Sequence, residues 1–203
     1  MATTTSPIHL KDACVAAAHA VIAEHGVEKL SLRDVARKLN VSHQAPYKHY
    51  ASRDHLLAEV IRRCFVKFSD ALKARSRSAD TKLDIHALGI SYLQFALQNP
   101  LEYRLMFGTA WPAVAADSMM LADARYSFDV LRQALEPLFV KLLNSTEKID
   151  AAAMFMWSTL HGLASIMQSQ TLYSLDLHPK FIENAEEQVM TLIDSALNAA
   201  TAD

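Results

Sequence analysis

The chain has 203 residues, of which 51% are hydrophobic, and its four Gly and six Pro are few for a fold built from strands and turns, so its composition favours an all-helical protein. The net charge of -2 conceals an asymmetry, because residues 1–78 hold 13 Lys and Arg against 7 Asp and Glu, while residues 79–203 hold 7 against 15. This asymmetry predicts that only the first part of the chain meets a polyanion.

The first three predicted elements are short helices. Residues 8–25 repeat apolar side chains at helical spacing, and Gly26 supplies a stop. Ser31 is predicted to cap a second helix that ends near Asn40, a residue able to adopt the left-handed conformation. A third helix is predicted over residues 42–50, with Ser42 as its cap.

The third predicted helix is unusually rich in hydrogen-bond donors. It carries two histidines, a glutamine, a lysine and two tyrosines within residues 43–50. A helix this short needs so many donors only if it faces a polar partner. Packed steeply against residues 31–40, it would project them into a DNA major groove, so the pattern predicts a helix-turn-helix.

A long helix is predicted to start at Ser52 and to extend an apolar face as far as Leu72. The polar segment 75–81 then interrupts the pattern. Further helices are predicted over residues 82–98, 118–143, 147–171 and 179–200, with a short segment at 101–107, a loop at 108–117 and a possible kink at Pro137. The domains expected are a helix-turn-helix domain over residues 8–52, and a linker helix with an effector-binding and dimerisation domain over 53–203.

Several residues of this pattern resemble the TetR family of bacterial transcriptional regulators. Over residues 10–60 they are Gly26, Leu32, Asp34-Val35-Ala36, Leu39, Val41-Ser42, Tyr47, His49-Tyr50 and Leu56-Leu57. The segment 103–107, Trp157 and Leu160-His161-Gly162 are similar to the signature of one branch of that family. Two positions depart from the family pattern, because Asn40 replaces a glycine and Pro46 replaces a leucine. We expect Pro46 to shorten or distort the third helix.

The resemblance implies a dimeric repressor that a small-molecule effector releases from a palindromic DNA operator, although activation is also possible. Tyr47, His49 and Arg53 match the positions that contact phosphates. Arg33, His43, Gln44 and Lys48 are candidates for reading bases, although Arg33 could instead pair with an acid. Ser42 and Tyr50 complete the DNA-binding set, and the ring of Tyr50 could alternatively pack beneath the motif.

The last two helices are expected to form the homodimer interface, although their apolar stripes could equally fill the core of one subunit. One stripe consists of Met156, Leu160, Leu163, Ala164 and Met167; the other consists of Phe181, Ala185, Val189, Leu192, Ile193 and Ala196. The effector is expected to bind among aromatic and methionine side chains that could also be plain core. They are Phe65, Tyr92, Phe95, Tyr103, Met106, Phe107, Trp111, Met154, Trp157 and His161.

Other functions have less support. The nine histidines show no HExxH spacing, and Cys14 and Cys64 show no metal or redox spacing, so we expect no metal, no cofactor and no enzyme. The chain shows neither a signal peptide nor ~20 consecutive apolar residues, so we expect a cytoplasmic protein that does not enter a membrane. A helical module that binds protein is the remaining alternative. Steep salt dependence would distinguish DNA binding from it.

Overall fold

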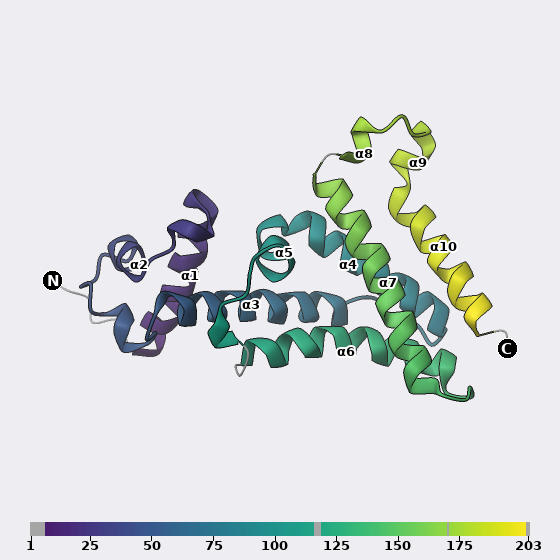
Figure 1. Cartoon of the computed structure of the whole chain (residues 1–203), viewed down its shortest axis with the longest axis horizontal. Helices are drawn as coiled ribbons and strands as arrows, with labels where there is room; N and C mark the ends of the chain where they lie inside the picture. Colours follow the sequence, from purple (N-terminus) through teal and green to yellow (C-terminus); the bar gives the residue numbers. More distant parts are fainter. Residues whose placement is uncertain (1–6, 116–118, 170, 202–203) are drawn as a thin grey trace. The chain divides into compact units, whose positions relative to one another are not determined.

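The computed structural model describes residues 7–115, 119–169 and 171–201. Within these ranges every regular element is helical, which confirms the predicted all-α class (Figure 1). The α-helices are α1 (Pro7–His25), α2 (Leu32–Lys38), α3 (Arg53–Lys73), α4 (Thr81–Gln98), α5 (Pro100–Phe107), α6 (Met119–Phe139), α7 (Ser145–Gln168), α8 (Thr171–Ser174), α9 (Pro179–Glu183) and α10 (Ala185–Ala200). Three short 3-10 helices are η1 (Val27–Lys29), η2 (Pro46–Lys48) and η3 (Ala113–Ala115).

The described residues divide into two compact units. The first contains the residues up to Phe65 together with 104–124, and the second contains 66–103 together with the residues from 125 onward. The division falls within α3, so this one helix supplies core residues to both units. The boundary predicted between residues 52 and 53 separates functions rather than compact units, and it stays a prediction.

In the first unit, local sequence signals determine where the helices begin and end. Gly26 ends α1 with a φ of 86°, a conformation that suits a residue without a side chain. The Ser31 hydroxyl accepts a hydrogen bond from the Asp34 backbone N–H at 3.1 Å, which confirms the predicted cap of α2. The core of the unit is formed by the apolar faces of its helices and includes Ala18, Ile22, Val35, Ala36, Leu56 and Ile61.

The second unit is organised around close packing of α4, α7 and α10. A Cβ atom placed on Gly89 of α4 would lie 2.3 Å from the sulfur of Met190 and 3.2 Å from the terminal methyl of Met156. Both methionines are buried, so the absence of a side chain at Gly89 lets three helices share one core.

A histidine adds a polar contact between α4 and α10. The imidazole of His86 lies 2.9 Å from a carboxylate oxygen of Asp194 and 3.2 Å from one of Glu187. Burial alone would lower the pKa of His86, but the hydrogen bonds and negative charges of the two carboxylates raise it. The protonated ring therefore favours attachment of α10 to α4.

The observed helices differ from the predicted ones mainly at their ends. The segment predicted at 101–107 is a helix, α5, which begins with Pro100 at a position where no N–H is required. The helix predicted over 118–143 ends at Phe139, shortly after Pro137; Ser118 lies outside the described residues. The helix predicted over 179–200 is interrupted at Asn184, which separates α9 from α10. The predicted loop 108–117 contains η3, and its last two residues lie outside the described ranges.

No helix among the described residues has the length and apolar character that crossing a membrane requires.

Two leucines of α4 provide a matched test of the second unit. Leu93 is fully buried, whereas Leu83 is 62% exposed. We expect Leu93→Ala to lower the free energy of unfolding by about 2–5 kcal/mol, because it removes buried methyl groups and leaves a cavity. Leu83→Ala should change it by less than about 0.5 kcal/mol. Urea denaturation followed by circular dichroism measures both, and equal losses would contradict this packing.

Candidate functional site

The turn after α2 has the conformation that the sequence predicts. Asn40 adopts a left-handed conformation with a φ of 52°. The backbone N–H of Asn40 donates to the Arg37 carbonyl at 3.1 Å, and that of Val41 donates to the Ala36 carbonyl at 3.1 Å. These bonds end α2 and redirect the chain into residues 42–50.

The prediction of an α-helix over residues 42–50 is wrong, and Pro46 explains why. Proline has no N–H with which to donate to the carbonyl of Ser42. That carbonyl instead accepts from the backbone N–H of Ala45 at 2.9 Å. The Pro46 carbonyl accepts from the N–H groups of His49 and Tyr50, each at 3.0 Å, so bonds that span three residues predominate and the bond from Tyr50 spans four. The segment is therefore a turn followed by η2, and Ser42 does not begin an α-helix. The distortion expected from Pro46 is confirmed.

Most of the predicted DNA-binding residues share one property, which is exposure on the surface of this turn and of α2. Tyr47 is 47% exposed, and His49 is half-buried. The other exposed members of the set are Arg33, Ser42, His43, Gln44 and Lys48. Within the described part of the chain, neither Arg33 nor Lys48 forms an ion pair with a carboxylate. Their charges are thus available to an anionic partner.

Tyr50 occupies a different environment from the rest of the set. Its ring is 4% exposed, and its hydroxyl donates to the Lys11 carbonyl at 3.3 Å. Burial raises the pKa of this phenol well above its usual value. The predicted DNA contact therefore does not fit this position, and the alternative, a ring packed beneath the motif, does.

Arg53 has a structural role that sequence reasoning missed. Its guanidinium donates to the carbonyl of Val27 at 2.7 Å and to that of Leu30 at 3.2 Å, and it pairs with Asp54 at 2.9 Å. The first turn of α3 thereby holds the connection between α1 and α2. Because both acceptors belong to the backbone, no residue pattern in the sequence marks them.

The start of α3 is capped as predicted. The Ser52 hydroxyl accepts from the backbone N–H of His55 at 3.4 Å and lies 2.8 Å from the Nδ1 atom of the His55 ring. The exposed ring of His55 therefore lies at the N-terminus of α3, which is the positive end of the helix dipole.

Four of the predicted effector residues lie together in the first unit. The ring of Phe65 meets those of Phe107 and Trp111 edge to face, with centroids 5.8 and 5.7 Å apart. The Trp111 indole N–H donates to the carbonyl of Met106 at 2.8 Å. Phe65 and Met106 are buried and belong to a core, whereas Phe107 is half-buried and Trp111 is 41% exposed at its edge.

A second predicted group forms a hydrogen-bonded chain in the second unit. The hydroxyls of Tyr92 and Tyr103 lie 2.7 Å apart, and the Tyr103 hydroxyl lies 2.6 Å from the Nδ1 atom of His161. Burial lowers the pKa of His161 and raises that of Tyr92 to about 12, so both groups are neutral near pH 7. The half-buried His161 thus has a hydrogen-bond partner within the chain, as the core alternative requires, and its contact with an effector stays a prediction.

The remaining predicted effector residues divide between core and surface. Phe95 is buried beside Phe68, with ring centroids 5.0 Å apart, and Trp157 lies 5.9 Å from the His161 ring. Met154 is exposed on α7, which does not fit a residue that lines an interior effector site. Met156, two residues further along α7, is buried instead. In the described ranges no group of three or more His, Cys, Asp and Glu side chains is placed to hold a metal ion.

Comparison with known protein families agrees with this architecture. The family described as "Bacterial regulatory proteins, tetR family" matches residues 15–60, and "Tetracyclin repressor-like, C-terminal domain" matches residues 85–196. The chain belongs to the TetR family. It is therefore a transcriptional regulator with a DNA-binding domain, in a family of regulators rather than enzymes.

Two named relatives match most of the length of this TetR-family chain. An HTH-type transcriptional regulator of Mycobacterium bovis is 31% identical over 175 residues, which cover 71% of this chain and 74% of the relative. The nucleoid occlusion factor SlmA of Glaesserella parasuis is 25% identical over 151 residues, covering 74% of this chain and 72% of the relative.

Solved structures share the fold at lower identity. A regulatory protein, SCO4313, superposes with a TM-score of 0.75 at 22% identity, covering 92% of this chain and 96% of that one. The fatty acid degradation regulator FadR from Bacillus halodurans superposes with a TM-score of 0.65 at 14% identity, covering 94% and 96%. Both likenesses concern the fold alone.

Substitutions of Arg53 and Arg33 compare an arginine that holds the fold together with one that is exposed on the surface. We expect Arg53→Met to lower the free energy of unfolding by about 1–2 kcal/mol, because two partly buried backbone carbonyls lose a charged donor. Arg33→Met, at an exposed position, should change it by less than about 0.5 kcal/mol. Guanidinium titration of both variants is the measurement, and a stability loss confined to Arg33→Met would contradict the role of Arg53.

Proposed function

We propose that this TetR-family chain is a dimeric repressor that binds a palindromic operator and leaves it when a small effector binds. The observation that carries the proposal is the turn over residues 40–48. Polar side chains are exposed on it, while Pro46 within the turn and Val35 and Ala36 of the preceding α2 are buried. A DNA-reading element requires a buried side that holds it rigid and an exposed side that is rich in hydrogen-bond donors. Such a regulator acts in the cytoplasm, where bacterial DNA lies.

The exposed residues divide into two proposed roles. Tyr47 and His49 donate to phosphates, and the capped start of α3 directs N-terminal amides at the same backbone. Arg33, His43, Gln44 and Lys48 read base edges, with glutamine suited to adenine and the cations to guanine. Ser42 lies at the start of this exposed segment and adds a hydroxyl. Tyr50 and Arg53 support the surface from behind and from its edge.

Selection of the purified protein against a random DNA duplex pool tests the proposal. We expect enrichment of a two-fold palindrome whose half-sites lie about 34–36 Å apart, with affinity falling steeply as salt rises. Tyr47→Phe should weaken binding about three- to tenfold for all sequences, because a phosphate hydrogen bond is lost. Gln44→Ala should remove about 1–3 kcal/mol of preference at one base pair.

Tyr173→Phe is a matched control, because Tyr173 is another exposed tyrosine, on α8. It should leave DNA affinity unchanged. The proposed assignment is wrong if Tyr47→Phe and Gln44→Ala weaken every sequence equally. Sequence-specific binding is excluded if a folded protein enriches no sequence.

The dimer interface is proposed on α7 and α10, but not on the whole of the predicted stripes. Met156, Leu160 and Leu163 of α7 are buried within one chain, as is Ile193 of α10. Exposed apolar side chains remain on both helices: Phe155 and Ile166 lie outside the predicted α7 stripe, whereas Leu192 belongs to the predicted α10 stripe. A Cβ atom on Gly162 would meet nothing within 4 Å, so α7 offers an open position for close helix approach. These features support an interface with a second copy.

Substitution at Leu192 tests this interface. Leu192 is 68% exposed in one chain, so Leu192→Glu is compatible with folding of the subunit. We expect it to weaken dimerisation at least about thirtyfold, because a charge would enter an apolar interface. Sedimentation equilibrium measures the effect, with Leu83→Glu at the exposed start of α4 as control. A dimer that tolerates Leu192→Glu but not Leu83→Glu would place the interface elsewhere.

The effector part of the proposal rests on family membership and on the two aromatic groups described above. An effector can shift the protein between two arrangements only if it binds one of them more tightly. Tyr92, Tyr103 and His161 supply polar groups. Such a ligand could form hydrogen bonds with these groups that replace the bonds they now form with each other. The aromatic rings around it supply apolar contacts.

A further inference from the structure

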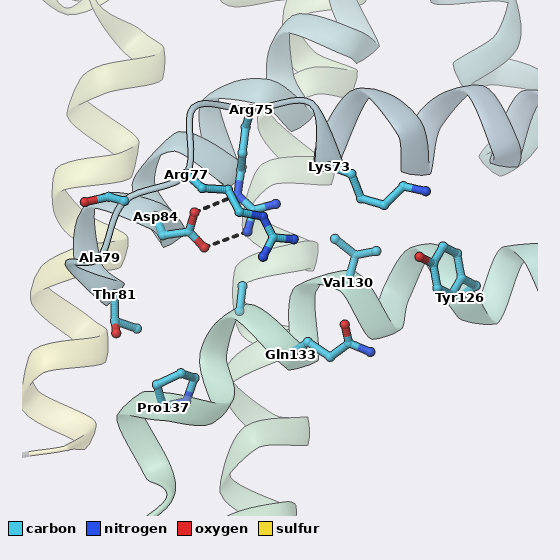
Figure 2. Close-up of a pocket in the computed structure, with 12 residues that line it drawn as sticks. Lys73, Arg75, Arg77, Ala79, Thr81, Asp84, Tyr126, Val130, Gln133 and Pro137 are labelled. Carbon is cyan, nitrogen blue, oxygen red and sulfur yellow. Dashed lines mark hydrogen bonds and ion pairs between the residues drawn. The ribbon is translucent and has the colours of Figure 1, made fainter.

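A pocket of about 320 Å³ lies within the second unit, at the end of α3. Figure 2 shows its two sides. Lys73, Arg75 and Arg77 come from the end of α3 and the segment that follows it, while Val130, Gln133 and Pro137 come from α6. This volume is at the lower end of the range of small-molecule sites. None of the predicted effector residues lines it.

One wall of the pocket is fixed by a buried ion pair. The Arg75 guanidinium donates to both carboxylate oxygens of Asp84, at 3.1 and 2.6 Å, and to the Leu72 carbonyl at 2.8 Å. The Arg75 side chain is only 2% exposed. This two-pronged pair anchors the segment after α3 to the start of α4, and it neutralises the carboxylate nearest the pocket.

The positive charge that remains comes from Arg77 and Lys73. Arg77 is exposed and pairs with no carboxylate within the ranges that the structure describes. The Lys73 ammonium lies 2.8 Å from Asp70 and 5.3 Å from the centre of the Tyr126 ring, so its charge is partly shared. Arg77 therefore provides the cation that is available to a ligand, and Lys73 adds to the positive potential.

The α6 side of the pocket is neutral and largely apolar. Val130 and Ala134 are buried and form the apolar part. Gln133 adds an amide on this side, and Thr81 at the start of α4 adds a hydroxyl to the lining. A cation that faces an apolar wall across a space of this size suits a ligand with an anionic head and a short hydrocarbon part.

We propose that this pocket binds a small organic anion, with its carboxylate or phosphate on Arg77 and its hydrocarbon part on Val130 and Ala134. A planar guanidinium pairs with either anionic group through two parallel hydrogen bonds. Gln133 and Thr81 supply further hydrogen bonds to the head group. The inference does not rest on the proposed repressor function, because binding concerns the free protein in the absence of DNA.

Titration calorimetry with three probes of one chain length tests the proposal: hexanoate, hexyl phosphate and the neutral alcohol hexanol. We expect both anions, or one of them, to bind at concentrations up to about 10 mM, and hexanol to bind at least about tenfold more weakly. Binding of hexanoate alone would identify a carboxylate site, and binding of hexyl phosphate alone would identify a phosphate site.

Two arginine variants complete the experiment. Arg77→Gln removes an exposed cation without touching the buried pair, and it should weaken binding of the anions about tenfold or more. Arg104→Gln, another exposed arginine outside the pocket, should leave binding unchanged. Circular dichroism confirms that both variants fold. Absence of binding by either anion, equal binding of hexanol, or equal binding by Arg77→Gln would each overturn the proposal.

Discussion

The apolar face of α3 is the constraint on which both compact units depend. Leu56, Ile61 and Phe65 are buried in the first unit, and Phe68 and Leu72 are buried in the second. Because they recur at helical spacing along one uninterrupted helix, neither unit can lose its share of this face without exposing apolar surface. At its first turn the same helix holds the α1–α2 connection through Arg53, and near its last turn Arg75 is fixed to α4.

The fold was largely predictable because its signals are local. Apolar spacing, the caps at Ser31 and Ser52, the stop at Gly26 and the left-handed Asn40 each act within a few residues, and each is found where the sequence predicts it. The division of the last predicted helix at Asn184 was not foreseen, since asparagine is compatible with several conformations. The composition also favours helices throughout, and this prediction of an all-helical fold needs no knowledge of long-range contacts.

The candidate site was less predictable because exposure is decided by tertiary packing. Tyr50 and Tyr47 are the same residue type three positions apart, yet only the packing of α1 and α3 decides that the first is buried. Arg53 resembles a surface cation in the sequence, but its partners are backbone carbonyls that no sequence motif records. Likewise Met154 and Met156 are two residues apart on α7 and lie on nearly opposite faces, about 200° apart around its axis, so only the packing of the helix decides which of the two methionines is buried. The anion pocket depends on residues from three segments, so no single stretch of sequence indicates it.

The 3-10 geometry of η2 limits how much DNA this element can read by itself. Three residues in a 3-10 helix advance about 6 Å, which corresponds to fewer than two base-pair steps along a duplex. Side chains there are separated by about 120°, so Tyr47 and Lys48 point in clearly different directions, and neighbours cannot share one base pair. For the proposed operator, η2 alone would thus carry little sequence information, so each half-site depends on the further base contacts proposed for Arg33, His43 and Gln44. Discrimination among genomic sites would then depend also on the spacing between half-sites and on how easily the intervening DNA deforms.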